Sequence, residues 1–287
     1  CETVVVLRNG EKVAEGPATD FDAASLTRAM TGRDVASAPP APLDASAAPL
    51  LHVESLNRAG AFEDVTFDLR AGEVLGIAGL LGSGRTTLAK ALFGLARPDR
   101  GTIMLDGIDI PLGDPIAAAA AGIGYVPEDR LTEGLFLEQS IAHNVAVGRL
   151  EAHAPGGVLN LSALWAEAAD WLKRLSVKAP DPGAPVRSLS GGNQQRVVLA
   201  RWMARQPRVL ILNGPSVGVD VGSKAEIHGI IADLAARGLG VIVISDDLPE
   251  LLATCHRILV MKDGVITEQV IGGSGVTEAD LSHRLAS

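Results

Sequence analysis

A glycine-rich segment between an apolar run and a helical pattern has the composition of a phosphate-binding loop. Residues 79–86 read GLLGSGRT and follow the apolar run VLGIA. Glycines allow positive φ, so successive N–H groups can point inward around phosphate oxygens, and a helix N-terminus adds partial positive charge. A ligand-free turn between a strand and a helix is the alternative interpretation. We expect a nucleotide's phosphates to be bound by Gly79, Gly82, Ser83, Gly84, Arg85, Thr86 and Thr87.

Two positions of this loop bear on the binding of Mg²⁺ and of the γ-phosphate. The Thr86 hydroxyl stands where phosphate loops place a Mg²⁺ ligand. Arg85 stands where the pattern has lysine. A guanidinium keeps the positive charge but replaces a compact ammonium with a broad planar fork. Nucleotide binding is therefore expected to survive, with altered geometry at the γ-phosphate.

A second glycine-containing segment opens another helical run. Residues 189–196 read LSGGNQQR. Serine and backbone N–H groups at a helix start can contact a phosphate, although a serine cap with a flexible glycine pair is the alternative. The segment resembles the ABC signature sequence, in the Asn-Gln-Gln form common in sugar importers. That resemblance implies contact with ATP held by a partner domain, through Ser190, Gly191, Gly192, Asn193 and Gln194.

Further segments resemble ABC motifs in the same order, and the resemblance covers residues 51–287. Residues 125–135 are similar to the Q-loop region, with Glu128 at the glutamine position. Residues 218–222 are similar to the D-loop, where Asp220 is the candidate functional residue. Residues 244–250 are similar to the switch region, with Asp246 at its histidine position. The implied fold is a P-loop NTPase of the ABC type, and the implied ligands are ATP and Mg²⁺.

Three further positions, in addition to Arg85, depart from the family pattern and are expected around one pocket. After the strand-like run 209–212 the family has Asp and Glu, but this chain has Asn213 and Gly214. Asparagine supplies no negative charge for Mg²⁺, and glycine has no group to polarise water, a loss of about 10²–10⁴ in rate. A carboxylate at Asp246 would repel the γ-phosphate. We therefore expect weak turnover in the chain's own pocket, while Ser190 completes the partner's site.

The elements that must position these residues follow from hydrophobic periodicity. Short apolar runs alternate with helical patterns, which favours an α/β fold with a mostly parallel core sheet. The resemblance adds an antiparallel β part, and residues 135–186 have the pattern of a helical insertion. Strands are expected at 73–78, 122–126, 209–212, 241–245 and 258–261, and helices at 86–93, 162–175, 193–205, 224–236 and 249–253.

The start of the chain repeats a segment near its end. Residues 1–10 read CETVVVLRNG and residues 255–264 read CHRILVMKDG, and Leu26 and Met30 echo Leu281 and Leu285. Chance similarity between two hairpins is the alternative, but strand, turn and helix recur in the same order. We expect residues 1–33 to be the tail of a preceding nucleotide-binding domain. Residues 34–50, rich in Pro, Ala and Ser, are then a linker to the domain 51–287.

Four aromatic or acidic positions near the motifs have competing interpretations. An adenine-stacking aromatic is expected upstream of the phosphate loop, and Phe62 is the candidate because Phe67 alternates with apolar neighbours like a core residue. Glu226 is interpreted as a solvated charge near a helix start, whereas a functional role is favoured for Asp220.

Composition limits the possible partners. The net charge is −9 and the pI is about 5.2, with no basic stripe, so nucleic acid is an unexpected partner. The cysteines, Cys1 and Cys255, indicate neither a disulfide framework nor a metal site. The resemblance implies a preceding nucleotide-binding domain, membrane permease subunits and, indirectly, a sugar-binding protein, at the cytoplasmic face of the membrane. Alternative functions are a non-catalytic nucleotide sensor and a DNA-repair ATPase, although the latter families insert zinc modules or coiled coils before the signature.

Overall fold

The computed structural model describes residues 1–8, 10–31, 43, 48–179, 181–272 and 275–286. Most of the linker expected at 34–50 lies outside the described residues. The strands are β1 (Thr3–Arg8), β2 (Glu11–Pro17), β3 (Leu51–Arg58), β4 (Phe62–Leu69), β5 (Val74–Gly79), β6 (Arg100–Leu105), β7 (Ile108–Asp109), β8 (Ile123–Val126), β9 (Val209–Asn213), β10 (Gly240–Ser245), β11 (Arg257–Lys262) and β12 (Val265–Ile271). The α-helices are α1 (Ala23–Thr31), α2 (Arg85–Leu92), α3 (Pro115–Ala121), α4 (Ile141–Ala146), α5 (Leu161–Arg174), α6 (Gly191–Ala204), α7 (Val221–Ala236), α8 (Leu248–Thr254) and α9 (Glu278–Ala286).

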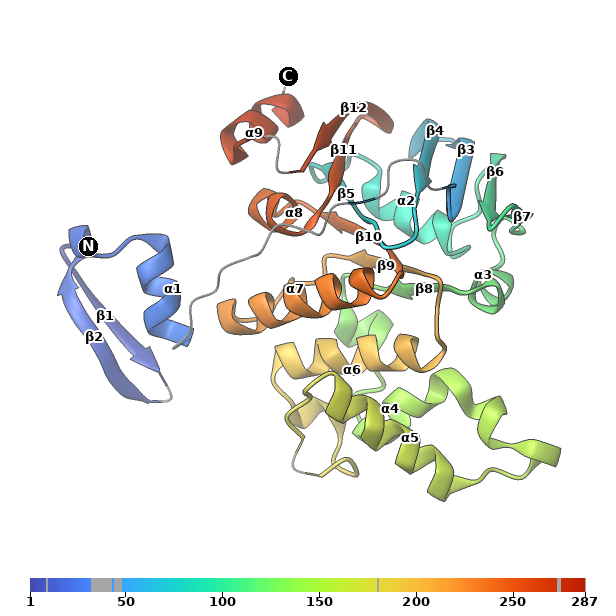
Figure 1. Ribbon diagram of the computed structural model, residues 1–287, viewed down its shortest axis with the longest axis horizontal. Coiled ribbons are helices and arrows are strands. Elements are labelled where there is room, and N and C mark those ends of the chain that lie inside the picture. The colour runs from blue at the N-terminus through green and yellow to red at the C-terminus, as the bar shows by residue number, and fades with distance from the viewer. Residues whose placement is uncertain (9, 32–42, 44–47, 180, 273–274, 287) are drawn as a thin grey trace.

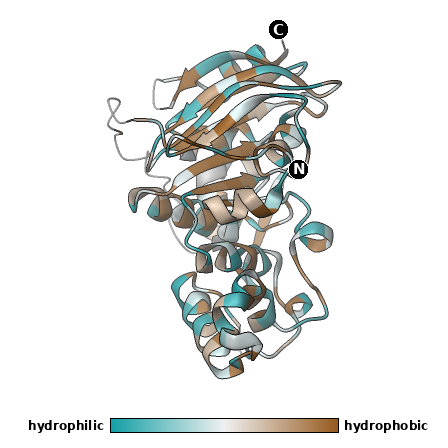
Figure 2. Cartoon of the chain, turned by 90° about the vertical axis from the view of Figure 1, so that its right-hand side faces the viewer, coloured by the Kyte–Doolittle hydropathy of each residue, from teal (hydrophilic) through white to brown (hydrophobic). Residues whose placement is uncertain are grey.

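A mostly parallel sheet forms the centre of the molecule (Figure 1). Its strand order is β12-β11-β5-β10-β9-β8, and only β12 runs antiparallel to its neighbour. Every residue of β5, β9 and β10 is buried, which is why these strands have continuous apolar sequences instead of alternating ones. Figure 2 shows the hydrophobic colouring concentrated in these inner strands. Because parallel strands end at one edge, the segments after β5, β9 and β10 lie at the same edge of the sheet.

Two hydrophobic cores cover the two faces of this sheet. On one face, β3, β4 and β6 form an antiparallel sheet with β7, and α2 is packed into the core between the sheets. Leu88 and Leu92 of α2 contribute to this core beside Leu51 and Phe67. On the other face, α6 and α7 pack with the helices α4 and α5, and Val197 and Ile227 are fully buried there. The phosphate-loop helix and the signature helix therefore belong to different cores.

The expected α/β fold is confirmed, with the strands and helices near the expected positions. The strand expected at 73–78 begins at Val74 instead, because Glu73 turns back to accept a hydrogen bond from the Arg70 N–H at 2.8 Å. The helix expected from Lys224 begins three residues earlier, because Asp220 caps it by accepting from the Ser223 N–H at 2.9 Å. Periodicity did not locate β3, β4 and β6, whose pairing contains register shifts, or β7, which has only two residues.

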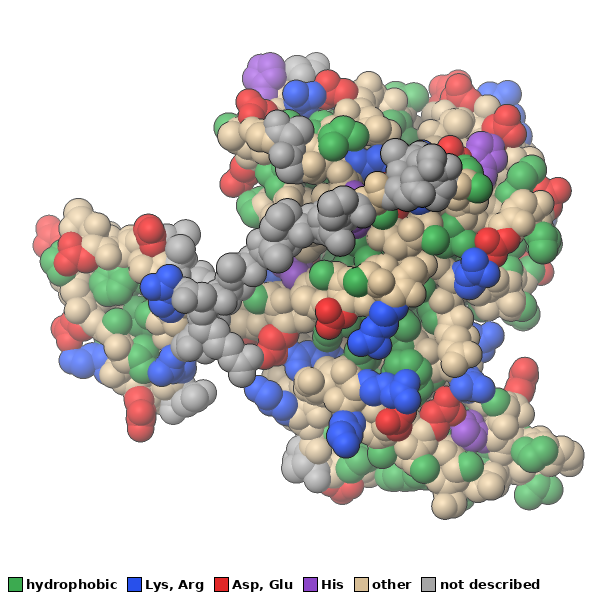
Figure 3. Space-filling model, in the orientation of Figure 1, with side chains coloured by type: hydrophobic (Ala, Val, Ile, Leu, Met, Phe, Trp, Pro, Cys, Tyr) green, Lys and Arg blue, Asp and Glu red, His purple; other side chains and the backbone are tan. Residues whose placement is uncertain are grey.

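The first described residues form a separate lobe. β1 and β2 make a two-stranded antiparallel sheet that does not join the central sheet, and α1 lies near α7 (Figure 1). Figure 3 shows this lobe beside the main body of the molecule. The pairing matches that of β11 and β12 at a shift of 254 residues: Thr3 faces Pro17 as Arg257 faces Ile271. The register shift also falls at matching places, after Val6 in β1 and after Val260 in β11. The similarity between the two segments therefore extends from sequence to strand register.

No helix among the described residues is long and apolar enough to cross a membrane. The two cysteines differ in environment, since Cys1 is exposed and Cys255 is fully buried. Burial raises the pKa of the Cys255 thiol to about 12. Cys255 is therefore protonated at neutral pH and shielded from thiol reagents.

Candidate nucleotide-binding site

The phosphate loop connects β5 to α2 in a conformation that only its glycines permit. Gly84 caps α2 with a φ of 94°, and a side chain there would meet the Ala61 carbonyl oxygen at 2.2 Å. Gly82 has a φ of 89°, and apart from its chain neighbours no described residue has a heavy atom within 4 Å of the place where a Cβ would lie. The first N–H groups of α2 have no partners within the helix, so they are available to an anion at the loop. Geometry and polarity of the loop fit the phosphates of a nucleotide.

Arg85 extends from the first position of α2 toward the switch segment. Its Nη2 lies 3.4 Å from Asp246 Oδ2, so the two altered positions contact each other. The Arg85 side chain is 7% exposed, whereas that of Asp246 is 64% exposed. Arg85 Nη1 is buried without a hydrogen-bond partner in the described part of the chain. The expected phosphate ligand is thus partly engaged by a protein carboxylate and retains an unsatisfied donor.

A cavity of about 460 Å³ lies beside the loop and brings together three expected site residues, Thr86, Glu128 and Asn213. Lys90, Tyr125 and Arg130 also line it. Asn213 ends β9, is 2% exposed, and has a buried Nδ2 without a partner. Thr86 and Asn213 would hold Mg²⁺ here, but the pair carries no formal charge, so the donor set fits a divalent cation poorly.

Tyr125 closes the inner side of this cavity next to Asn213. Burial raises the pKa of the Tyr125 hydroxyl to about 12, and the nearby Asn213 amide partly opposes that shift. Among the described residues, neither Tyr125 Oη nor Asn213 Nδ2 has a partner at hydrogen-bond geometry. The Tyr125 hydroxyl is therefore neutral at physiological pH and does not replace the missing acidic group.

Gly214 is adapted to having no side chain. Its φ is 58°, and a Cβ there would meet Val217 Cγ2 at 2.9 Å and Glu128 Cγ at 3.0 Å. The exposed Glu128 side chain thus passes through space that a side chain at 214 would need. Restoring glutamate at 214 would strain the backbone and displace Glu128. The backbone conformation and the neighbouring side chains therefore favour glycine at position 214 over the glutamate of the family pattern.

The signature segment lies at the start of α6, and its residues do not line the cavity, although Gly191 packs against Arg130 and Gly218, which do. Ser190 is exposed at the helix cap and its Oγ accepts a hydrogen bond from Asn193 Nδ2 at 3.0 Å. Gly191 and Gly192 are tightly packed, since a Cβ on Gly192 would lie 2.2 Å from Ser223 Oγ. Gln194 is buried and points toward the Val186 carbonyl at 3.5 Å, so the structure does not bring its side chain to the exposed face beside Ser190.

Arg130 connects the Q-loop segment to the D-loop segment, a role that the sequence did not indicate. Its guanidinium donates to the carbonyl oxygens of Val217 at 2.6 Å and Gly218 at 2.9 Å. A Cβ on Gly191 would lie 2.7 Å from Arg130 Nη2, so the same group also touches the signature segment. The only sequence signal was an arginine within the turn at 125–135. Arg130 thus fixes three motifs relative to one another.

Replacing Arg130 with glutamine is expected to loosen the turn at 217–218. Hydrogen bonds from charged donors contribute about 1.5–3 kcal/mol, so the free energy of unfolding should fall by a comparable amount. Amide hydrogen exchange within residues 216–220 should accelerate. Arg187→Gln is the control, because Arg187 is 62% exposed and pairs with the exposed Glu138. Unchanged exchange at 216–220 in Arg130→Gln would show that the two carbonyl contacts do not hold the turn.

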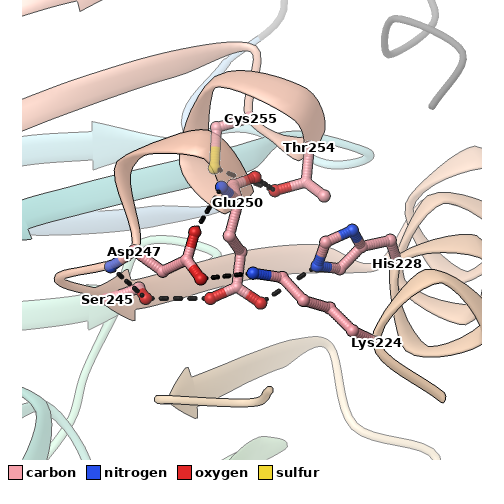
Figure 4. Close-up of polar contacts among 7 residues, drawn as sticks. All are labelled: Lys224, His228, Ser245, Asp247, Glu250, Thr254 and Cys255. Atoms are coloured by element: carbon pink, nitrogen blue, oxygen red, sulfur yellow. Dashed lines mark hydrogen bonds and ion pairs between the residues drawn. The ribbon is translucent and has the colours of Figure 1, made fainter. Parts of the chain in front are cut away.

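A buried polar network attaches the switch segment to α7 (Figure 4). Glu250 is 1% exposed, and its carboxylate accepts from Ser245 Oγ at 2.8 Å and contacts His228 Nε2 at 3.0 Å. Asp247 caps α8 and pairs with Lys224. Asp220 of the D-loop segment caps the N-terminus of α7. The same helix carries Lys224 and His228, which contact the switch segment, so α7 connects the two segments.

Two sequence interpretations need correction. Phe62 is 3% exposed and belongs to the core between the sheets, so it offers no face to adenine, and Phe67 is a core residue as expected. Glu226 is not simply solvated, because it forms an ion pair with Arg196, whose side chain is 4% exposed. The buried Arg196 requires a compensating charge, which periodicity cannot reveal.

The fold and the loop define a P-loop ATP-binding protein of the ABC type. Residues 62–217 match the family model described as "ABC transporter", and the chain belongs to that family. It is 41% identical over 94% of its length to the ribose import ATP-binding protein RbsA 2 of Streptomyces avermitilis, covering 54% of that protein. It is 42% identical to RbsA 1 of the same organism, covering 97% of this chain and 52% of that protein.

Solved structures agree on the fold. The structure of cbiO1 from Clostridium perfringens, part of an ABC transporter complex, superposes with a TM-score of 0.68 at 25% identity, covering 83% of this chain and 94% of that chain. The chain spans about half the length of the curated relatives it matches.

Proposed function

We propose that this chain is an energy-coupling module of an ABC importer for sugars or polyols, working as the second of two tandem nucleotide-binding domains. The import of ribose by proteins 41–42% identical supports the substrate class. The matched strand register of β1–β2 and β11–β12 supports a preceding domain of the same kind. Membrane permease subunits and a sugar-binding protein are the further proposed partners, at the cytoplasmic face of the membrane.

The two ATP sites of the tandem are proposed to be unequal. The observations that carry this proposal are that Asn213 lines the cavity beside the phosphate loop, that a side chain at Gly214 would meet Glu128 of that cavity, and that Arg85 contacts Asp246. Ser190, in contrast, is exposed at the start of α6. In this arrangement the preceding domain supplies a competent phosphate loop. Ser190 and the N–H groups at the start of α6 then contact the γ-phosphate bound there. The chain's own pocket binds nucleotide with little turnover.

A purely non-catalytic nucleotide-binding module is the second candidate, and the same altered residues favour it. The two candidates differ in the expected role of Ser190. In the leading proposal the signature segment acts on a competent site, so changes there affect turnover. In a purely regulatory module they would not.

The permease is proposed to dock on the Q-loop side of the molecule. Leu131 and Phe136 are exposed hydrophobic side chains in this region, 45% and 55% exposed respectively, and the Phe136 N–H donates to Asn144 Oδ1 of α4 at 2.9 Å. We expect a cysteine replacing Leu131 to crosslink to the permease. A cysteine replacing Asp233, exposed on α7, is the matched control. Cys1→Ser removes the reactive background thiol, and the buried Cys255 needs no replacement.

Crosslinking of the tandem protein assembled with its permease tests this docking face. The expected result is a permease adduct from position 131 and none from position 233. Adducts at position 233 alone would place the permease on the α7 face and contradict the proposed arrangement.

A further inference from the structure

Arg85 contacts the carboxylate of Asp246 on the side where a third phosphate would extend. In phosphate loops the residue at this position reaches the β- and γ-phosphates. Here that residue is 6% exposed, and its Nη2 is 3.4 Å from Asp246 Oδ2. Any phosphate group beyond the β-position would therefore approach Asp246 as well as Arg85. Two negative groups would compete for one guanidinium.

The other cations at the cavity are already engaged. Lys90 Nζ lies 2.9 Å from Glu133 Oε1, and Arg130 is held by the carbonyl oxygens of Val217 and Gly218. Glu128 adds an exposed carboxylate to the same cavity. Among the described residues that line the cavity, Lys90 and Arg130 are thus bound to other protein groups, and Glu128 adds negative charge.

A buried amide donor in the cavity has no acceptor among the described residues, and an oxygen atom of a ligand could accept its hydrogen bond. Asn213 is 2% exposed, lines the cavity and has an Nδ2 without a partner among the described residues. A buried donor without an acceptor is costly unless a ligand or water satisfies it. An uncharged amide cannot, however, attract the Mg²⁺ that usually screens a triphosphate.

We propose that this pocket binds a nucleoside diphosphate in preference to the corresponding triphosphate. The backbone N–H groups of the loop hold the α- and β-phosphates, which a diphosphate also has. The third phosphate adds negative charge beside Asp246, and it must share the Arg85 guanidinium with that carboxylate. The inference rests on the proposed nucleotide binding by the chain's own pocket, and it assigns that pocket a ligand different from the substrate of the partner's site.

Equilibrium titration of the purified chain with fluorescent ADP and a fluorescent non-hydrolysable ATP analogue tests the inference, with and without Mg²⁺. We expect ADP to bind about tenfold more tightly, the size expected for one extra charge near a solvent-exposed carboxylate. Asp246→Asn should reduce the ADP preference to about twofold or less. Asp106→Asn is the matched control, because Asp106 is an exposed carboxylate paired with Arg208 at 2.8 Å elsewhere on the surface.

The outcomes separate the inference from the function on which it rests. A preference for ADP that shrinks in Asp246→Asn and persists in Asp106→Asn supports it. Equal or tighter binding of the triphosphate analogue by the unchanged chain overturns the inference but leaves nucleotide binding intact. An unaltered preference in Asp246→Asn also overturns it. Failure of both nucleotides to bind overturns nucleotide binding in this pocket as well.

Discussion

Replacing Ser190 with phenylalanine is expected to reduce ATP turnover by the assembled tandem transporter about 100-fold or more. The exposed Ser190 sits at the start of α6, where its hydroxyl and the following N–H groups are proposed to face the γ-phosphate in the partner's site. Removing one preorganised donor from a transition state typically costs about 10²–10³ in rate. A phenylalanine ring also occupies the space of the phosphate. Steady-state phosphate release measures the effect.

Two further variants make this result specific. Ser282→Phe introduces the same ring at an exposed serine on α9 and should leave turnover unchanged. Arg85→Ala alters the chain's own phosphate loop and should reduce turnover less than Ser190→Phe. Gly192→Asp is a poorer test, because a Cβ there would lie 2.2 Å from Ser223 Oγ and would disturb α7 directly. Equal losses in Ser190→Phe and Arg85→Ala would contradict unequal sites.

The second large effect concerns stability, and it comes from the network that attaches the switch segment to α7. Glu250→Ala removes the buried carboxylate that accepts from Ser245 Oγ and contacts His228. Removing one partner of a buried polar pair leaves the other groups unsatisfied, and we expect a loss of about 3 kcal/mol in unfolding free energy. The midpoint of urea unfolding, followed by circular dichroism, measures this loss.

The control for Glu250→Ala is Glu138→Ala. Glu138 is 72% exposed and pairs with Arg187 at 3.4 Å, a geometry that contributes about 0–1 kcal/mol. Similar midpoints for the two variants would mean that the Glu250 network does not stabilise the fold. In that case the proposed connection between switch and D-loop segments through α7 would also be unsupported.

The sequence predicted the central sheet well because its strands are buried on both faces. The runs at 209–212 and 241–245 have no helical period, and the structure places them in β9 and β10. Strands of the antiparallel sheet were not located, since the pairing of β3 with β4 contains register shifts. Helix starts were misplaced where a side chain supplied the cap, as Asp220 does for α7.

The site was predictable in its residue types but not in its contacts. The motifs identified Arg85 and Asp246 as altered, yet only the fold shows that they contact each other. Likewise, Gly214 could be recognised as lacking a side chain, whereas its φ of 58° and its contact with Glu128 require coordinates. Arg130 was missed for the same reason, because its partners are 87 and 88 residues away in sequence.

Unequal ATP sites are tested most directly by comparing steady-state ATP hydrolysis of this chain alone with that of the full tandem protein in its transporter. In the chain alone, Gly214 stands where the family has the glutamate that polarises water, so its rate per molecule should be lower by about 10²-fold or more. The tandem should hydrolyse ATP with one active site per molecule, which burst or vanadate-trapping stoichiometry can count. A chain that hydrolyses ATP alone at the rate of the tandem would contradict the proposal.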